Sequence, residues 1–483
     1  MWPLAAPLAV MSTNLLHRPV QARELPSQSL LERMDKPGPR YTSYPTADRF
    51  NEDFDAPRLS HALGQRRHAD ELGLARPLSV YIHIPFCESV CYYCACNKVV
   101  TKHHERAAPY LDALNIELDL VCAEIGWQRS VAQLHLGGGS PTFLSDAEIA
   151  RLMAMLRRAF FLLPAAEISI EVDPRTVSAA RLAHLRAQGF NRISFGVQDF
   201  DLDVQQAVHR VQSFESVRDL MQQARALGFA SINADLIYGL PRQTPASFAR
   251  TIAQVAELLP DRIALYAYAH LPERFRPQRR IDVAELPKPV ARVEMLAAAM
   301  AGFQASGYSY IGMDHFALPD DALTIASREG RLQRNFQGYS THPDFDLIGL
   351  GVSAIGRMGN CYYQNAKTLP DYYAALDAGR LPVTRGLTLD TDDLVRRDII
   401  MALMCHGRVD FDEVARTHGL RVPEAFADEL AQLRPLCADG LVVLEDDAIQ
   451  VTSHGWYVVR AIALVFDRYL KRGAPRERFS RIV

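Results

Sequence analysis

The 483-residue chain has no excess of basic residues and no long hydrophobic run. Each of these absences argues against one class of protein. It carries 53 Lys and Arg against 56 Asp and Glu, a formal net charge of −3, whereas a dedicated nucleic-acid binder usually shows a basic excess. No apolar run reaches the roughly 18 residues that a membrane-spanning helix needs. The composition is that of an ordinary soluble protein, long enough for one large domain and one or two small ones.

A secretory signal is also absent. In the N-terminal stretch "MWPLAAPLAVMSTNLLHR" no basic residue precedes the apolar part, and Arg18 follows it, which is the wrong order for export. We interpret this stretch as a disordered leader. Alternatively, the start is overextended, and the chain is initiated at Met11 and not at Met1.

Cysteine is scarce outside one short stretch. The chain has 8 cysteines, and a disulfide framework, which is typical of short secreted domains, is not indicated. Four cysteines lie within ten positions, a segment called here the cysteine loop (residues 87–96). Such clustering in a large protein suggests a metal site in the reducing cytoplasm. The other four are predicted to be small core residues: Cys122, Cys361, Cys405 and Cys437.

From about residue 77 the pattern alternates between β-rich runs and helical segments. Start signals support the helices: Ser145 and Glu148 form a capping box, and Thr244 precedes a proline at the first helical position. Strands that alternate with helices predict a parallel sheet with helical crossovers, here a TIM-like barrel, complete or partial. The predicted strands lie in "LSVYIHIPF", "VAQLHLGGG", "EISIEVDP", "NRISFGVQ", "SINADLIYG", "DRIALYAYA" and "YSYIGMDHF".

The functional groups of such barrels lie at the carboxyl ends of the strands. Here those ends carry polar, glycine-rich and cysteine-rich segments, which predicts an active site on that rim. The segments are "CESVCYYCAC", "GGGSPT", "EVDP", "GVQDF", "DLIYGLP" and "YAHLP".

We divide the chain into an N-terminal leader and arm (1–70), a barrel (71–375) and a small, mostly helical domain (376–483). The last is predicted to contain three helices, a hairpin and a final helix, an arrangement similar to a winged helix. Residues 385–483 hold 14 Lys and Arg against 16 Asp and Glu, which favours a structural lid or cap over a DNA-binding module. The first 70 residues look irregular, and "DKPGPRYTSYPTADRF" is either a linker or an ordered arm packed against the barrel.

The cysteine loop fits an iron–sulfur cluster better than zinc. Structural zinc prefers two separated cysteine pairs, whereas Cys87, Cys91 and Cys94 have the spacing C-x3-C-x2-C within one short loop. Three such thiolates can each reach a different iron of a [4Fe–4S] cube.

The motifs together resemble one family. A three-cysteine loop after the first strand of a barrel is similar to the radical S-adenosylmethionine (SAM) superfamily. A wider set of motifs, from about residue 30 onward, resembles the oxygen-independent coproporphyrinogen III oxidases: "PGPRYTSYPTA", "YIHIPFCESVCYYCACNKVVT", "HLGGGSPTFL", "ISIEVDPR", "RISFGVQDF", "DLIYGLP", "YAHLP", "IGMDHFA" and "LIGLGVSAIG".

The resemblance implies that Cys87, Cys91 and Cys94 ligate a [4Fe–4S] cluster and that SAM binds the remaining iron. The implied reaction converts coproporphyrinogen III to protoporphyrinogen IX without O2, by decarboxylation of two propionates. Cys96 is then a surplus thiol and not a ligand. The implied partner is a low-potential one-electron donor such as flavodoxin or ferredoxin. We expect a cytoplasmic monomer with neither a nucleic-acid partner nor a membrane span.

The family also implies two SAM molecules. The positions that match the first are Tyr81, Gly138, Glu171 and Ile355. The positions that match the second are Tyr93, Gly139, Ser140, Gln198, Arg210, Asp235 and Ala269. Each is placed at or just after a predicted strand end, except Arg210, which is placed early in the following helix. By residue type, Arg210 suits a carboxylate and Asp235 an ammonium group or ribose.

Three further details remain open at this level. Basic groups should line a site for four propionates, and the candidates are Arg40 and the loop from Arg274 to Arg280. His83 is either a proton shuttle or a buried structural histidine. Ala95 stands where the family often has glycine, and it would be strained if the backbone needs a positive φ.

Two other functions compete with the oxidase. A related haem chaperone shares the radical SAM core, but it typically lacks the fourth cysteine and the "PGPRYTSYPT" arm, both of which this chain has. A zinc-stabilised winged-helix regulator is disfavoured by the charge of the C-terminal part and by the composition of the barrel rim.

Overall fold

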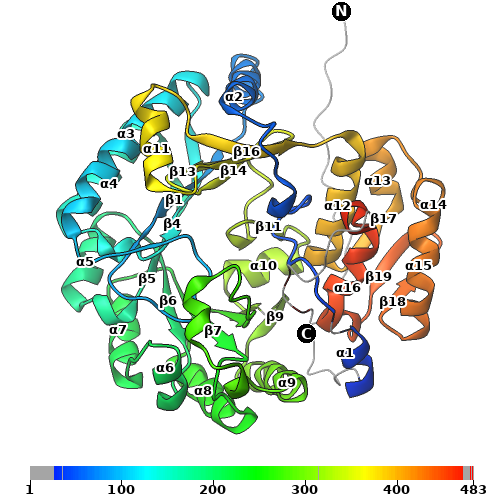
Figure 1. Cartoon of the computed structure of the whole chain (residues 1–483). Coiled ribbons are helices and arrows are strands. Elements are labelled where there is room, and N and C mark those ends of the chain that lie inside the picture. Colours follow the sequence, from blue (N-terminus) through cyan, green and yellow to red (C-terminus); the bar gives the residue numbers. More distant parts are fainter. Residues whose placement is uncertain (1–26, 35, 314, 472–478, 480, 482–483) are drawn as a thin grey trace, which may run out of the picture.

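The computed structural model describes residues 27–34, 36–313, 315–471, 479 and 481 (Figure 1). The predictions about the leader and about the alternative starts Met1 and Met11 lie outside the described residues. Among the helices that are described, none is both long enough and apolar enough to cross a membrane.

A parallel sheet with an outer ring of helices forms the larger part of the protein (Figure 1). Its six main strands run parallel, and each pairs with the next one in this series. They are β1 (Leu78–Ile84), β4 (Ser130–Gly138), β5 (Phe161–Val172), β6 (Arg192–Gln198), β7 (Ser231–Tyr238) and β8 (Arg262–Ala267). The helices are α3 (Ala107–Glu124), α4 (Asp146–Ala159), α5 (Ala179–Ala187), α6 (Leu202–Ala207), α7 (Phe214–Ala226), α8 (Pro245–Leu258) and α9 (Pro289–Ala305).

The start signals of two helices act as predicted. Ser145 and Glu148 form both hydrogen bonds of a capping box at the start of α4. Thr244 caps α8, whose first residue is Pro245. These local bonds satisfy N–H groups that a helix start leaves without partners.

The sheet extends beyond the main strands on both sides and stays open. On one side β13 (Leu347–Leu350) pairs with β1 in parallel, and β14 (Ile355–Met358), β15 (Cys361–Asn365) and β16 (Val383–Thr388) follow antiparallel. On the other side β10 (His315–Ala317) and β9 (Ser309–Gly312) add two antiparallel strands. Since β16 and β9 form the two ends of the sheet order, the prediction of a partial α/β barrel is confirmed. Strands β13 to β16 were not predicted.

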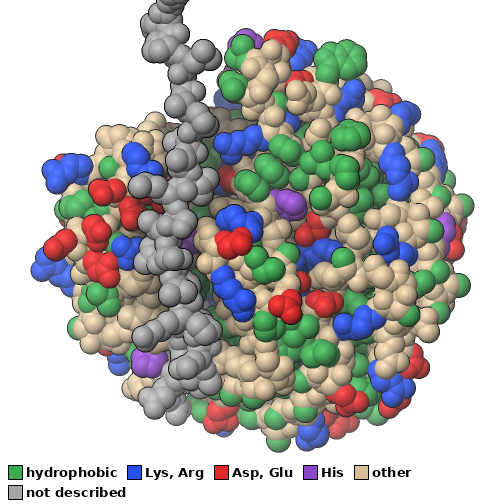
Figure 2. All heavy atoms as spheres, turned by 180° about the vertical axis from the view of Figure 1, so that it is seen from behind, with side chains coloured by type: hydrophobic (Ala, Val, Ile, Leu, Met, Phe, Trp, Pro, Cys, Tyr) green, Lys and Arg blue, Asp and Glu red, His purple; other side chains and the backbone are tan. Residues whose placement is uncertain are grey.

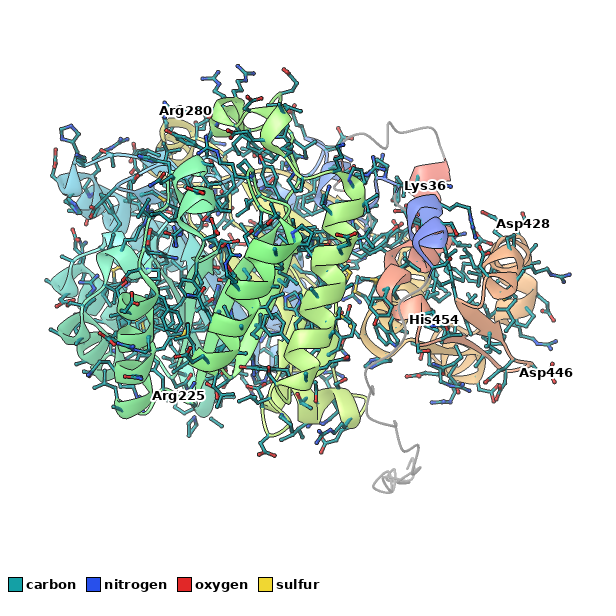
Figure 3. The ribbon with its side chains drawn as sticks, turned by 90° about the horizontal axis from the view of Figure 1, so that it is seen from below. Lys36, Arg225, Arg280, Asp428, Asp446 and His454 are labelled. Atoms are coloured by element: carbon teal, nitrogen blue, oxygen red, sulfur yellow. The ribbon has the colours of Figure 1, made fainter. Side chains whose placement is uncertain are left out.

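The C-terminal part packs around a second hydrophobic core, to which the N-terminal arm and residues 311–339 of the barrel part also contribute. Its helices are α12 (Thr391–His406), α13 (Phe411–His418), α14 (Val422–Ala425), α15 (Ala427–Ala438), α16 (Val459–Ala463) and α17 (Arg468–Lys471). The predicted hairpin is β18 (Val442–Leu444) and β19 (Ala448–Val451), and β17 (Arg408–Asp410) adds a third, unpredicted strand beside β19. Figure 3 shows Asp428 and Asp446 at the end of this part that points away from the barrel.

The N-terminal segment is more ordered than the sequence suggested. It contains α1 (Gln28–Met34) and the 16-residue helix α2 (Ala56–Glu71), so the prediction of an irregular segment is wrong for these two stretches. The missed signal is Asp55, which caps α2 by accepting a hydrogen bond from the Arg58 N–H. An aspartate before a proline in the first turn is an ordinary helix start.

Residues 36–50 form an ordered arm that packs against both the C-terminal part and the barrel. Tyr41 and Tyr44 are fully buried in the C-terminal core. The Tyr41 hydroxyl donates to Asp467 at 3.0 Å, and the Tyr44 hydroxyl accepts from the Arg468 N–H at 3.2 Å. The arm also packs against the barrel as expected, since the Phe50 ring stacks on that of Tyr362 in β15 with centroids 5.8 Å apart. What the sequence did not show is that the arm joins the barrel to the C-terminal part.

Candidate active site

The cysteine loop lies between two short paired strands, β2 (Phe86–Cys87) and β3 (Val99–Val100), directly after β1. Cys87, Cys91 and Cys94 all line one cavity of about 410 Å³ at the carboxyl ends of β4, β5 and β6. The local chain path is held by backbone hydrogen bonds, among them Thr101 N–H to Cys87 C=O at 2.9 Å. The three cysteines that the spacing singled out therefore face the predicted rim together.

The donors around these thiols fit an iron–sulfur cluster. Two guanidinium groups point at the sulfur of Cys91: Arg210 Nη1 at 3.5 Å and Arg175 Nη2 at 3.7 Å. Cationic donors of this kind stabilise a thiolate ligand. In the part of the chain that the structure describes, no three His, Cys, Asp or Glu side chains converge as a single metal ion requires. Three thiols that share a cavity without converging suit a cluster whose irons each take one thiolate.

Asp173 joins the two arginines into one ion-paired group. Arg175 Nη2 lies 2.7 Å from Asp173, and both terminal nitrogens of Arg210 lie 3.2 Å from the same carboxylate. Burial alone would raise the pKa of Asp173, but the hydrogen bond from Arg175 and the charge of Arg210 hold it below its ordinary value. In this structure the carboxylate that Arg210 binds is thus a protein group. Arg210 also lies between α6 and α7 and not inside a helix, which corrects the predicted position.

The ends of β1 and β4 approach each other so closely that side chains are excluded. The Gly139 N–H donates to Ile84 C=O at 2.8 Å. Gly138 has φ +116°, and a Cβ there would lie 2.7 Å from the His83 ring. A Cβ on Gly139 would lie 2.7 Å from the Pro85 carbonyl oxygen. The last two positions of "GGG" at this strand end are therefore restricted to glycine.

Glu171 and Tyr81 belong to a polar group on the inner face of the barrel. The Glu171 carboxylate accepts from the Gly138 N–H and lies within hydrogen-bond distance of His135 Nε2, both at 3.2 Å. Burial would raise the pKa of Glu171, but its contacts with His135 and Gly138 lower it. Tyr81 stacks on His135 with ring centroids 5.9 Å apart. Both Tyr81 and Asp235 lie within their strands and not at the ends, in contrast to the prediction.

His83 is held as a neutral, buried side chain. Its Nε2 lies 2.9 Å from the Asn97 carbonyl oxygen, to which it must donate, so Nδ1 accepts from the Tyr81 hydroxyl at 3.0 Å. Burial lowers the pKa of His83, which keeps it uncharged near neutral pH. Of the two roles considered, this geometry favours the structural one.

The two predicted groups of SAM-binding residues line two adjoining cavities. Tyr81, Gly138, Glu171 and Ile355 all line a wide cavity of about 980 Å³. The cavity of about 410 Å³ is lined by six of the seven others: Tyr93, Gly139, Ser140, Gln198, Arg210 and Asp235. Ala269 lines neither cavity, and its carbonyl oxygen accepts from Gln278 at 3.1 Å. The cavities share Cys94, Gly138 and Glu171 among their walls.

Comparisons with known proteins agree with this architecture. Residues 81–255 match the model of the radical SAM superfamily, and residues 389–458 match that of the HemN C-terminal domain. The chain is 49% identical to the oxygen-independent coproporphyrinogen III oxidase of Pseudomonas aeruginosa over 94% of this chain and 98% of that protein. This chain belongs to that family. The same enzyme of Escherichia coli is 48% identical over 94% of this chain and 98% of its own length.

A solved structure carries the same fold as this family member. The coproporphyrinogen III oxidase from Escherichia coli, described as a radical SAM enzyme, superposes with a TM-score of 0.87 at 47% identity, over 93% of this chain and 100% of that one. Members of the radical SAM superfamily use a [4Fe–4S] cluster and SAM, and this chain is a member. The individual ligand assignments, including Cys87, Cys91 and Cys94, stay predictions.

Asp235 is the clearest perturbed acid of this oxidase's cavities. It accepts from the Ser194 hydroxyl at 2.7 Å and from the Asn233 amide at 2.9 Å. Burial raises its pKa to about 6. Sequence reasoning found Asp235 but missed both donors. Asn233 lies two residues earlier on the same face of β7, whereas Ser194 becomes a neighbour only through the pairing of β6 with β7.

Only some of the basic residues predicted to bind propionates line the wide cavity. Arg274 and Arg276 line the wide cavity. Arg280 stacks on Tyr92, and Figure 3 shows it at the outer margin of the barrel. Arg40 lies over the ring of Tyr266, 5.5 Å from its centroid, and does not line the wide cavity. Three basic residues on the cavity wall were missed because they come from unrelated segments: Lys98, Lys367 and Arg385.

The backbone and the surface bear on two smaller points. Ala95 is not among the residues with a positive φ, so alanine causes no strain there. On the face shown in Figure 2, Lys and Arg side chains are interspersed with Asp and Glu and form no continuous basic field. Such a field is what a nucleic-acid-binding surface usually carries.

Proposed function

We propose that the protein catalyses the oxygen-independent oxidative decarboxylation of coproporphyrinogen III to protoporphyrinogen IX. The observation that carries the proposal is the pair of adjoining cavities beside the cysteine loop, lined by two separate sets of family-matched residues. In the net change, each of two propionate side chains loses a hydrogen atom, CO2 and one electron and becomes a vinyl group.

Cys87, Cys91 and Cys94 would hold the cluster, and Arg175 and Arg210 would orient the Cys91 sulfur. When bound, the cluster and SAM supply the one-electron radical chemistry that removes a hydrogen atom from the substrate. The chain's own part is to position the groups and to keep water away from them. The loop carrying the thiols is anchored to the barrel by the Tyr92 N–H, which donates to Val208 C=O at 3.0 Å.

We further propose two SAM molecules, one in each cavity. In the wide cavity, Glu171 offers an acceptor and Tyr81 an apolar wall. In the smaller cavity, Asp235 offers a carboxylate to an ammonium group or to ribose hydroxyls, and Tyr93 a ring to stack on adenine. Because the carboxylate of Asp173 already occupies Arg210, a bound carboxylate there would share or displace that ion pair.

The remaining assignments complete the proposal. The cysteines are all free thiols, in keeping with a reducing, cytoplasmic location. A flavodoxin or ferredoxin would supply electrons to a monomeric enzyme. The divisions at residues 70/71 and 375/376 are proposed as domain boundaries, with the C-terminal part as a cap that holds the N-terminal arm.

The test is anaerobic reconstitution with iron and sulfide, followed by addition of SAM, a reductant and coproporphyrinogen III. We expect CO2 release and a divinyl product that depend on all three additions. Stoichiometric haem binding without CO2 or vinyl product would overturn the oxidase in favour of the haem chaperone.

A further inference from the structure

The wide cavity carries an excess of positive charge that the proposed radical chemistry does not explain. Its walls include five cationic side chains but a single acidic one, Glu171. The cations are Lys98, Arg274, Arg276, Lys367 and Arg385. They come from four separate parts of the chain: the cysteine loop's far end, the segment after β8, the segment after β15, and strand β16.

Three of these cations lie near one another and form no salt bridge among the described residues. Arg274, Lys367 and Arg385 have no carboxylate within ion-pair distance among the described residues. Burial and the positive charges of Arg385 and Arg274 lower the pKa of Lys367. Burial and Arg274 lower the pKa of Arg385, and the charge of Asp48 only partly offsets them. Arg274 and Lys367 are exposed at the cavity mouth and Arg385 is half-buried, and like charges gathered in this way repel one another unless an anion joins them.

Neighbouring groups orient these cations. Arg385 Nε donates to Gln364 at 2.7 Å, and its guanidinium lies 5.8 Å from the Phe50 ring centroid. Arg274 lies 5.4 Å from the ring centroid of Phe275. The carbonyl oxygen of Lys367 accepts from Asn97 at 2.9 Å, which ties its segment to the end of the cysteine loop. Guanidinium groups that lie over aromatic rings are pre-organised for carboxylates, and Arg385 is held further by its bond to Gln364.

We propose that Arg274, Lys367 and Arg385 form a carboxylate-binding subsite that anchors substrate propionates which are not being decarboxylated. The inference rests on the proposed function and adds the contacts that hold the substrate. A carboxylate paired with cations is stabilised as the anion, so its loss as neutral CO2 is disfavoured there. The reacting propionate would instead lie toward the cysteine loop. The cavity volume, about 980 Å³, is at the upper end of the range for small-molecule sites.

The test measures binding to the cluster-loaded enzyme by fluorescence, with two probes. Coproporphyrin III is a stable tetracarboxylate, and its tetramethyl ester keeps the ring but has no charge. We expect Arg274→Gln, Lys367→Gln and Arg385→Gln each to weaken tetracarboxylate binding about tenfold and to leave ester binding unchanged. Arg385→Lys should recover part of the affinity.

The matched control comes from the same loop as Arg274. Arg279 lies 3.8 Å from Glu273 and does not line the cavity, so Arg279→Gln should bind both probes like the wild type. In turnover, the three subsite variants should raise KM about tenfold with kcat within about twofold. Unchanged tetracarboxylate affinity, or an equal loss for the ester, would overturn the subsite. Charge-dependent binding by a wild-type protein that forms no vinyl product would instead support the subsite and overturn the proposed function.

Discussion

Glu117 is a buried acid whose ionisation should control the stability of the protein. It lies in α3 and is only 2% exposed. Its carboxylate accepts from the Tyr372 hydroxyl at 2.6 Å, the Gly351 N–H at 2.8 Å and the Asn365 amide at 2.6 Å. This network holds the segment that leads from β13 to Ile355 on the wall of the wide cavity.

Burial outweighs these three hydrogen bonds and raises the pKa of Glu117 from 4.5 to about 7. The folded protein therefore holds this proton more tightly than the unfolded chain does. The associated stability is fully present below pH 4.5, and it is lost as the pH rises through 7. The ionisation of Glu117 alone should lower the free energy of unfolding by about 2.5 kcal/mol between about pH 5 and about pH 8.

Glu117→Gln isolates this contribution, because glutamine fills the same space and does not titrate. Urea unfolding of the cluster-loaded wild type and variant should be compared under argon at about pH 5 and about pH 8. All other titrating groups and the cluster are common to both proteins and cancel in the difference. We expect the stability of the wild type relative to Glu117→Gln to drop by about 2.5 kcal/mol on going to the higher pH. Parallel pH profiles of the two proteins would refute the reasoning.

Three further predictions concern single side chains. Cys96→Ser should keep its iron content but lose oxidase activity, whereas loss of iron would make Cys96 a cluster ligand. Gly138→Ala adds a methyl group against the His83 ring at positive φ, and should lower the unfolding free energy by about 2 kcal/mol in urea; a variant as stable as the wild type would contradict the close approach of β1 and β4. Tyr41→Phe removes the hydrogen bond to Asp467 and should lower the free energy of unfolding by about 1–3 kcal/mol, measured as a lower urea midpoint. An unchanged midpoint would show that this contact of the arm does not stabilise the protein.

Much of the barrel and its rim could be predicted because the signals are local. A strand buried on both faces needs a run of apolar residues, and a helix start needs a capping side chain, so Ser145 and Thr244 marked helix starts correctly. The three-cysteine spacing also lies within one loop, and this loop meets the rim because it directly follows β1. These features depend on neighbours in the chain, which the sequence displays directly.

The sequence by itself determined the repeating α/β pattern, the rim on which functional groups gather and the composition of the cysteine loop. The tertiary structure decided which distant residues meet there. It paired Arg210 with Asp173, kept Ala269 out of both cavities and brought Lys367 and Arg385 to the wall of the wide cavity. The physical reason is that such contacts depend on the order and the register of the strands. Short strands such as β13 to β16 contain too few residues for the sequence pattern to indicate their order or their register.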